Sequence, residues 1–389
     1  MEIKQLMFAL IRSEICGTEP AEQIKNELTE DVCKELFILS QKHDMSHIVA
    51  SAVKKLGAFC ENEVSAAFDT TLMMSAYRDG QRDYAINLTS SVLEDAGIPY
   101  ILLKGSELRY YYPETWMRTS CDIDVLIHNE DTEAAEQVLC AAGFRRMQDS
   151  STHDYNYMSP NEFHVEIHFT LSQEDKLPLV NALLESVWEK YTVLAEGKMN
   201  QYRMTPELFM IYHLAHMGRH LISGGCGVRP FVDLWLLNRR MSFDEGKLNI
   251  LLKETNLAEL YAVSTKLSEV WMEDKEHSDI TEMLEEYILC GGVYGTLANA
   301  AKMKSATGTS ATKSLYNMIF LPRQNLEILY PNLKKYPFLF FFYQVKRWFN
   351  VFHKKKRDRA KNITKAYQTL SGDEVDAAKI LLNGLGLDE

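Results

Sequence analysis

The apolar residues of this 389-residue chain change their spacing twice, and this change limits the folds that the chain can adopt. Up to about residue 97 they recur every three or four positions, as in Ile3–Ile11 and Val32–Leu39, which is typical of amphipathic helices. Between Pro99 and Phe169 short apolar runs and alternating segments indicate strands. From Thr205 onward the spacing is helical again. The sequence therefore predicts an α+β fold, with a small mixed β-sheet flanked by N-terminal and C-terminal helical regions.

These changes place three regions, at residues 1–97, 98–204 and 205–389. The helical spacing of residues 63–96 stops at Gly97, and a single two-turn helix is expected over Ser106–Tyr112, closed by Pro113. A further amphipathic helix is expected over Asp131–Ala142. The predicted strands are Pro99–Leu103, Ile123–Ile127, Phe144–Gln148, Tyr155–Ser159 and Phe163–Phe169.

The composition of the chain argues against several classes of protein. The formal net charge of −12 argues against long nucleic acid as a partner. The seven cysteines are scattered and form no C-x-x-C pair, which favours a reducing, cytoplasmic location over a disulfide framework or a thiolate zinc site. The first residues lack the apolar segment and cleavage site of a signal peptide, and no run of 18 apolar residues indicates a transmembrane helix.

Asp122 and Asp124 lie on a segment that otherwise has the composition of a buried strand, Ile123-Asp-Val-Leu-Ile127. Residues two apart on a strand point to the same face, so both carboxylates face the same way, about 7 Å apart. Buried carboxylates are unfavourable unless they are paired or bind a cation. The pair therefore predicts a divalent metal site, with a loop or a helix cap as the structural alternative.

A third carboxylate is available in Glu166, on the alternating segment His164-Val-Glu-Ile-His168. Two acids on one strand and one on a neighbouring strand could hold one or two Mg²⁺ ions, or Mn²⁺, with substrate phosphates completing the shell. Two such ions bind the attacking and leaving oxygens in phosphoryl or nucleotidyl transfer. Without a cation the acids would repel one another, and the pKa of at least one of them should be raised. The alternative for Glu166 is an ordinary exposed strand residue.

Upstream, Lys104-Gly-Ser106 falls where a strand turns into a helix. Gly105 would let the backbone approach a phosphate closely, and Ser106 would share this phosphate-binding turn. Lys104 and Arg118 could neutralise phosphate oxygens. The alternatives are that Gly105 is a turn glycine and that both cations are surface charges.

These motifs, in this order, resemble the DNA polymerase β-type nucleotidyltransferase superfamily: a strand with Lys104-Gly-Ser106, then Asp122-Ile-Asp124, then Val165-Glu-Ile167. More narrowly, they resemble the bacterial family of uncharacterised nucleotidyltransferases. Tyr212-His-Leu-Ala-His216, with Arg229 and Asp233, is similar to the helical half of that family, and so is Tyr330-Pro with the aromatic and basic tail. The resemblance spans about residues 85–355.

The resemblance implies a nucleotidyltransferase core and a Mg²⁺-dependent enzyme that moves an NMP group from an NTP, such as ATP, to an acceptor hydroxyl with release of pyrophosphate. Asp122, Asp124 and Glu166 would be the metal ligands and catalytic residues. It does not supply the acceptor, which could be a small molecule or a protein. The alternative is an inactive nucleotide-binding sensor or scaffold protein of the same fold.

Histidines form two further clusters. His164 and His168 share a strand face with Glu166, and His213, His216 and His220 fall within about 60° on one helical face. They are candidates for substrate contacts, together with Arg229, although packing near the cleft and zinc binding are alternatives. Arg229 and Asp233 are one helical turn apart and could pair with each other.

The tail interleaves aromatic and basic residues from Phe338 to Lys361. It could be a helix packed by its aromatic stripe, a peripheral membrane contact through residues 338–361, or a site for a protein partner.

Overall fold

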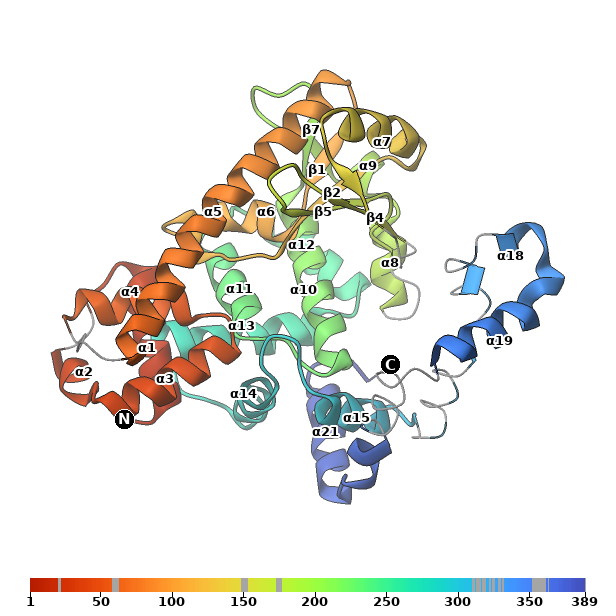
Figure 1. Cartoon of the computed structure of the whole chain (residues 1–389). Helices are drawn as coiled ribbons and strands as arrows, with labels where there is room; N and C mark the ends of the chain where they lie inside the picture. Colours follow the sequence, from red (N-terminus) through yellow and green to blue (C-terminus); the bar gives the residue numbers. More distant parts are fainter. Residues whose placement is uncertain are drawn as a thin grey trace.

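The computed structural model describes residues 1–19, 22–57, 63–147, 153–172, 177–309, 332–351 and 364–388, with isolated positions at 312, 316, 320, 321, 323, 326, 327, 330 and 362. The predicted mixed sheet between helical regions is confirmed (Figure 1). The basic stretch from His353 to Lys361 and the end of the strand expected at Gln148 lie outside these residues.

The N-terminal helices form a separate group at one end of the molecule in Figure 1, and α5 runs from this group to the sheet. α5 has 33 residues and is therefore about 50 Å long. It ends before Gly97, which adopts φ +69° as a helix-terminating glycine does. The helices of this region are α1 (Ile3–Cys16), α2 (Glu22–Glu27), α3 (Glu30–Lys42), α4 (Ser46–Lys55) and α5 (Glu63–Asp95).

The seven strands form one mixed sheet in the order β3-β4-β5-β2-β1-β7-β6. The pairings β2–β5 and β1–β7 are parallel, and the others are antiparallel. The strands are β1 (Tyr100–Leu102), β2 (Asp122–Ile127), β3 (Arg145–Arg146), β4 (Asp154–Met158), β5 (His164–His168), β6 (Thr192–Leu194) and β7 (Gln201–Met204).

Short helices connect these strands. The single helix expected over Ser106–Tyr112 was wrong: α6 (Lys104–Leu108) is followed by the 3₁₀ turns η1 (Arg109–Tyr111) and η2 (Thr115–Met117). The remaining connections are η3 (Asn129–Asp131), α7 (Thr132–Ala141), α8 (Pro178–Leu184) and α9 (Val187–Lys190).

The C-terminal region is helical, as predicted from Thr205 onward. α18 and α19 lie apart from the sheet and from the other C-terminal helices (Figure 1). The helices are α10 (Pro206–Ser223), α11 (Arg229–Arg240), α12 (Glu245–Glu254), α13 (Ala258–Glu273), α14 (Asp279–Gly291), α15 (Leu297–Ala306), α18 (Asn332–Lys335), the turn η4 (Pro337–Leu339), α19 (Phe340–Val351) and α21 (Gly372–Gly384).

Two apolar clusters hold these parts together. One face of the sheet, through Ile123, Val125 and Val165, packs against α5 and α7. The larger cluster joins the N-terminal helices to α10, α11 and α13, and includes a stacked pair of Phe8 and Trp271 with ring centroids 4.5 Å apart. Because the first cluster covers one face of β2 and β5, the polar residues that alternate with it lie on the opposite face.

Within the part of the chain that the structure describes, no helix combines the length and apolarity needed to cross a membrane.

Candidate active site

The carboxylates come together through the parallel pairing of β2 and β5. In this register Asp122 lies opposite His164 and Asp124 lies opposite Glu166. The intervening Ile123 and Val125 are buried in the apolar cluster below the sheet, and their burial holds the acids on the opposite face. The prediction that the Asp-x-Asp segment is a strand, and that Glu166 lies on its neighbour, is therefore confirmed.

Asp124 is the most enclosed of the three acids. Its Oδ1 accepts hydrogen bonds from Lys104 Nζ at 2.7 Å and from His168 Nε2 at 2.9 Å. Burial alone would raise the pKa of this carboxyl, but the Lys104 ammonium and His168 outweigh burial and hold the pKa of Asp124 well below its usual range. Asp124 is therefore a carboxylate at any physiological pH, and Lys104 balances its charge.

Asp122 has the opposite electrostatic environment. Burial, followed by the negative charge of Asp124, raises its pKa, although the hydroxyl of Ser120 donates a hydrogen bond of 2.6 Å to its Oδ1. The expected repulsion between the two aspartates is therefore present. It raises the pKa of Asp122, whereas at Asp124 it is outweighed by Lys104 and His168. A cation near Asp122 would relieve it.

Glu166 faces both histidines of its strand. Its Oε1 is 3.6 Å from His164 Nδ1, and its Oε2 is 3.6 Å from His168 Nε2. Among the described residues, Asp124, Glu166 and His168 form one of two groups whose ligand atoms all lie within 4.8 Å of one another. Asp122, which the sequence placed among the metal ligands, lies outside this group, and His168 stands within it.

The donor chemistry of this group fits a divalent cation. Two carboxylates supply the hard oxygens that Mg²⁺ and Mn²⁺ prefer, and an imidazole suits Mn²⁺ better than Mg²⁺. The Lys104 ammonium on Asp124 shows that this position already attracts a positive charge. Lys104 also adopts φ +43°, a left-handed conformation that costs a residue of this type about 1 kcal/mol. Such a backbone outlier beside an acidic pair is typical of a functional site.

A cavity of about 240 Å³ opens beside the two aspartates, between the sheet and the helices α10 and α11. It brings together predicted residues from β2, α6 and the C-terminal helices. The predicted site residues that line it are Lys104, Gly105, Arg118, Asp122, Asp124, His213, His216, His220 and Arg229. The other four, Ser106, His164, Glu166 and His168, lie outside its lining.

Gly105 and Ser106 differ in their access to this cavity. A Cβ on Gly105 would lie 3.2 Å from both Cβ and Oγ of Ser120, so the glycine allows the close packing of α6 against the residue that hydrogen-bonds Asp122. Ser106 is buried, and its hydroxyl has no hydrogen-bond partner.

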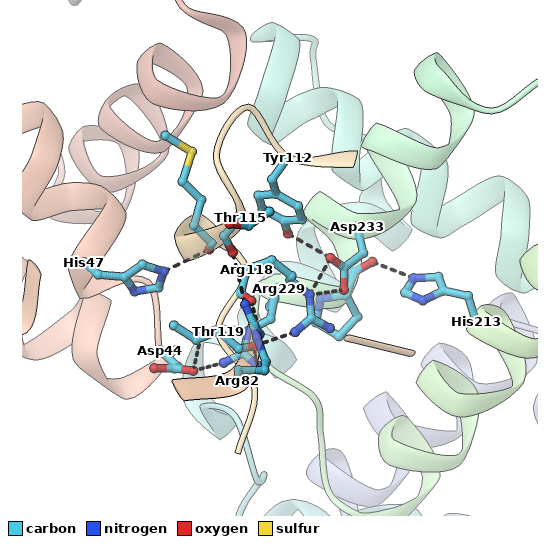
Figure 2. A network of polar contacts seen from close by, with 12 residues as sticks. Asp44, His47, Arg82, Tyr112, Thr115, Arg118, Thr119, His213, Arg229 and Asp233 are labelled. Carbon is cyan, nitrogen blue, oxygen red and sulfur yellow. Dashed lines mark hydrogen bonds and ion pairs between the residues drawn. The ribbon is translucent and has the colours of Figure 1, made fainter. Parts of the chain in front are cut away.

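The loop that precedes β2 is held from both sides by polar contacts (Figure 2). We call residues 112–120 the clasped loop. From the N-terminal side, Arg82 donates to the carbonyls of Arg118 at 2.5 Å and Thr115 at 3.1 Å, and His47 Nε2 donates to the Met117 carbonyl at 2.9 Å. These contacts fix the backbone immediately before Asp122.

From the C-terminal side, the clasped loop is held by Asp233 on α11 (Figure 2). Arg118 Nε donates to Asp233 Oδ1 at 2.8 Å and to Oδ2 at 3.1 Å, and the Tyr112 hydroxyl donates to Oδ1 at 2.8 Å. Arg118 is buried, so the alternative that it is a surface charge was wrong.

Arg229 and Asp233 do not pair with each other, and that expectation was wrong. Arg229 instead forms an ion pair with Asp44, and its NH1 donates to the Thr119 carbonyl at 3.1 Å. Arg229 does not pair with Asp233 because Arg118, on the clasped loop, already forms an ion pair with the Asp233 carboxylate.

The sequence-based reasoning missed Asp44 and Tyr294, which also line the cavity. Asp44 follows α3 at φ +54°, and Thr119 Oγ1 donates to its carboxylate at 2.8 Å. A single aspartate between two predicted helices gave no functional signal, since Asp is common at such positions.

The α10 histidines share the cavity with the aspartates. His213 Nε2 lies 2.9 Å from the Pro230 carbonyl and therefore donates to it. Burial lowers the pKa of His213, and it lowers that of His216 much further, with Lys104 adding to the effect. The rings of His216 and His220 meet edge to face with centroids 4.5 Å apart. His213 and His216 therefore present neutral imidazoles to the cavity, which can accept as well as donate hydrogen bonds.

Searches of the curated proteins and of the solved structures found no match. The sequence profile of one family, described as "Uncharacterised nucleotidyltransferase", matches residues 30–273.

The matched segment begins at the start of α3 and ends with α13. It contains the whole sheet, the clasped loop, and both α10 and α11, and so covers nearly all of the site just described. Tyr330 and the tail, which the sequence-based resemblance included, lie beyond it. Because the match covers more than half of the 389 residues, the chain belongs to the family of uncharacterised nucleotidyltransferases.

Proposed function

We propose that this protein is a cytoplasmic enzyme of the DNA polymerase β type, which uses Mg²⁺ or Mn²⁺ to transfer an NMP group from an NTP such as ATP to an acceptor hydroxyl. The observation that carries the proposal is the parallel register of β2 and β5, with Asp124 opposite Glu166 and Asp122 two residues away at a cavity. In addition, the seven cysteines are scattered along the sequence without a C-x-x-C pair, which favours a reducing compartment.

Asp122, Asp124 and Glu166 would hold the cation. When bound, it would offset the negative charge of the phosphates and make the acceptor hydroxyl easier to deprotonate. Lys104 would then be released from Asp124, and its flexible ammonium could follow the phosphate oxygens instead. The short contact between Lys104 and Asp124 supports this exchange, because both groups lie where opposite charges would meet in the complex.

The remaining nucleotide contacts would come from Gly105, Ser106 and Arg118. Gly105 and Arg118 line the cavity, and Ser106, whose hydroxyl has no hydrogen-bond partner, follows Gly105 in the chain. Arg118 would be held rigidly, because its guanidinium donates a hydrogen bond to Asp233 on α11. Such fixed positive charges stabilise phosphates without reorganisation during the reaction.

In the reaction, the acceptor oxygen would attack the α-phosphorus and form a new P–O bond. The bond from the α-phosphorus to the oxygen bridging to the β-phosphate would break, and pyrophosphate would leave with that electron pair. Glu166 would take the proton of the acceptor hydroxyl, directly or through water.

The acceptor would contact the side of the site formed by His164 and His168 or the cavity wall formed by His213, His216 and Arg229. A volume of about 240 Å³ supports an acceptor that inserts a small polar group, from either a small molecule or a protein side chain. The net charge of −12 argues against long nucleic acid in this role.

The alternative is a nucleotide-binding sensor or scaffold that has lost turnover. The intact set of three acids on one sheet face favours the enzyme. Release of pyrophosphate, measured with each of the four NTPs and a panel of hydroxyl acceptors, separates the two functions, because a sensor binds the NTP and releases none.

The metal site itself is tested by thermal unfolding with and without Mn²⁺ and NTP. Ligands at a hundredfold excess over the dissociation constant should stabilise the wild type by about 2.7 kcal/mol. Asp122→Asn should lose most of this stabilisation while unfolding at the same temperature, or a higher one, without ligands, because it removes the charge that Asp124 repels.

The matched control is Asp95→Asn, which alters an exposed aspartate at the end of α5. It should keep the full ligand-induced shift. If the Asp122 and Asp95 variants shift equally, the metal site and the enzyme assignment are both wrong.

A further inference from the structure

The polar face of the sheet continues beyond the three acids to β4. In the antiparallel register of β4 and β5, Asp154 lies directly opposite His168, and Asn156 lies opposite Glu166. Directly opposite residues point to the same face, so Asp154 shares the polar face with His168. Tyr157 and Val165 lie opposite each other at the alternate positions of these strands and therefore point to the other face. Both are buried in the apolar cluster there.

His153, which precedes β4, completes a cluster around this pair. Its Nε2 lies 3.0 Å from Asp154 Oδ2, and its ring stacks on that of His168 with centroids 5.7 Å apart. Among the described residues, these three form the second group whose ligand atoms all lie within 4.8 Å of one another. Ligands of a metal with bonds of about 2.1 Å lie at most about 4.2 Å apart, so small side-chain movements would close the group around an ion.

The ligand chemistry of this group differs from that of the acids on β2. Two imidazoles and one carboxylate favour a transition metal, whereas Mg²⁺ prefers oxygen ligands alone. Access is provided by His153, whose side chain is 28% exposed, while those of Asp154 and His168 are 6% and 4% exposed. The group therefore has two enclosed ligands and one at the surface, as an ion entering from solvent requires.

We propose that His153, Asp154 and His168 form a second cation site, which takes a transition-metal ion such as Zn²⁺ or Co²⁺. The site is distinct from the group of Asp124 and Glu166, although His168 belongs to both. It does not rest on the proposed nucleotidyl transfer, because its ligands would bind the metal without NTP. Since His168 Nε2 also bonds Asp124, an ion at the second site would compete for this imidazole.

Titration of the full chain with Co²⁺ tests the proposal, because visible absorption of bound Co²⁺ reports nitrogen and oxygen ligands directly. His153→Gln should weaken Co²⁺ binding at this site at least about tenfold, since it removes one of three protein ligands. Asp154→Asn should do the same through the carboxylate. The unfolding temperature of each variant without metal shows that it is folded.

His164→Gln is the matched control. His164 lies on the same face of β5 and has the same 28% exposure, but it belongs to neither group. It should leave the Co²⁺ spectrum and affinity unchanged. Glu166→Gln, which removes a ligand of the other group only, should still bind Co²⁺ through His153, Asp154 and His168. If the His153 and His164 variants bind Co²⁺ alike, the site does not exist.

The result is independent of activity. Pyrophosphate release that fails in every assay would count against the enzyme and leave this site standing. Loss of all Co²⁺ binding in Glu166→Gln would overturn this site, because the metal would then have been held by the acids of the other group.

Discussion

Lys104 and Asp124 illustrate how a buried charge is tolerated when a residue of opposite charge lies beside it. The carboxylate is almost fully buried, and it keeps its charge because an ammonium and an imidazole surround the same oxygen atom. Removing one partner of such a pair leaves the other charge uncompensated, whereas removing both can be nearly neutral. The contribution of Asp124 to folding is therefore separable from its proposed role in metal binding.

We expect Asp124→Asn to lower the free energy of unfolding by about 3 kcal/mol, because it leaves the Lys104 ammonium without its counter-charge. Lys104→Met combined with Asp124→Asn should be less destabilising than the sum of the two single variants. Urea unfolding of the wild type, both single variants and the double variant measures this coupling. Strictly additive effects would show that the ion pair does not stabilise the fold.

Some residues of the site could be predicted from local pattern alone. Alternation within Ile123–Ile127 and Phe163–Phe169 placed Asp122, Asp124 and Glu166, because a strand with one apolar face fixes the direction of every side chain. Asp44 and Tyr294 could not be predicted this way, because they reach the cavity only through the docking of separate helices. For the same reason the pairing of Arg118 with Asp233 was not expected: the two residues are 115 positions apart.

At the level of elements, the strands between Pro99 and Phe169 were predicted and the two later ones were not. β1 to β5 all overlap the predicted segments, and α7 matches the predicted helix to within one residue at each end. The strands β6 and β7 were missed because they are short and mix polar with apolar residues, as in Gln201-Tyr-Arg-Met204. Such short strands form because a neighbouring strand supplies hydrogen bonds, which a sequence window does not show.

α6 shows how a tertiary contact can move the start of a helix. The sequence predicted a helix that starts at Ser106, with Lys104 and Gly105 at the turn from the preceding strand. The helix instead begins at Lys104 and includes Gly105. Gly105 packs closely against Ser120, and a larger residue at this position would press against the Ser120 side chain. Packing therefore outweighs the intrinsic preference of glycine here.

The exposed aromatic side chains of the turn η4 and of α19 give the membrane hypothesis a testable form. Phe338 and Phe341 are 78% and 76% exposed, and the sequence that follows contains the basic run Lys354–Arg357. We expect the chain to co-sediment with vesicles rich in anionic lipid, and less so at high salt. Phe338→Ser with Phe341→Ser should reduce binding at least about tenfold, because each buried phenyl ring contributes more than about 1 kcal/mol.

Tyr294→Ser is the control for this prediction, because Tyr294 is 83% exposed and lies at the cavity instead. It should leave vesicle binding unchanged. Equal binding of all three proteins to neutral and anionic vesicles would exclude docking through this segment and favour a protein partner.

At the scale of the whole molecule, the clasped loop connects the N-terminal helices to the sheet. His47 on α4 is the buried contact of this junction: it bonds the Met117 carbonyl, and its ring meets Trp116 edge to face. Burial lowers its pKa from 6.5 to about 4. The folded protein therefore keeps His47 neutral at pH values at which the unfolded chain protonates it.

Stability should therefore decline on the acid side of neutrality. A lowered pKa in the folded state contributes stability that is present above pH 6.5 and is lost as the pH falls toward 4. Between pH 8 and pH 5, His47 should contribute a loss of about 2 kcal/mol. His47→Gln keeps a hydrogen-bond donor but cannot titrate, so its free energy of unfolding should fall by about 2 kcal/mol less over this range.

Urea unfolding at pH 8 and pH 5 provides the measurement and its own control. The difference between the two proteins at pH 8 reports packing alone, because His47 is neutral in both states there. His43, whose pKa is also lowered to about 4 by burial, acts equally in both proteins. The same pH dependence in wild type and variant would show that His47 does not govern this junction.

The two sets of contacts on the clasped loop also differ in when they can form during synthesis. His47 and Arg82 precede the loop by 70 and 36 residues, so both have been made when Met117 and Arg118 are translated. Asp233 follows Arg118 by 115 residues, a delay of roughly 6 to 23 s at ribosomal speeds of about 5–20 residues per second. The clasped loop can therefore pack against the N-terminal helices first. The cavity is completed only when α11 has been translated and docks.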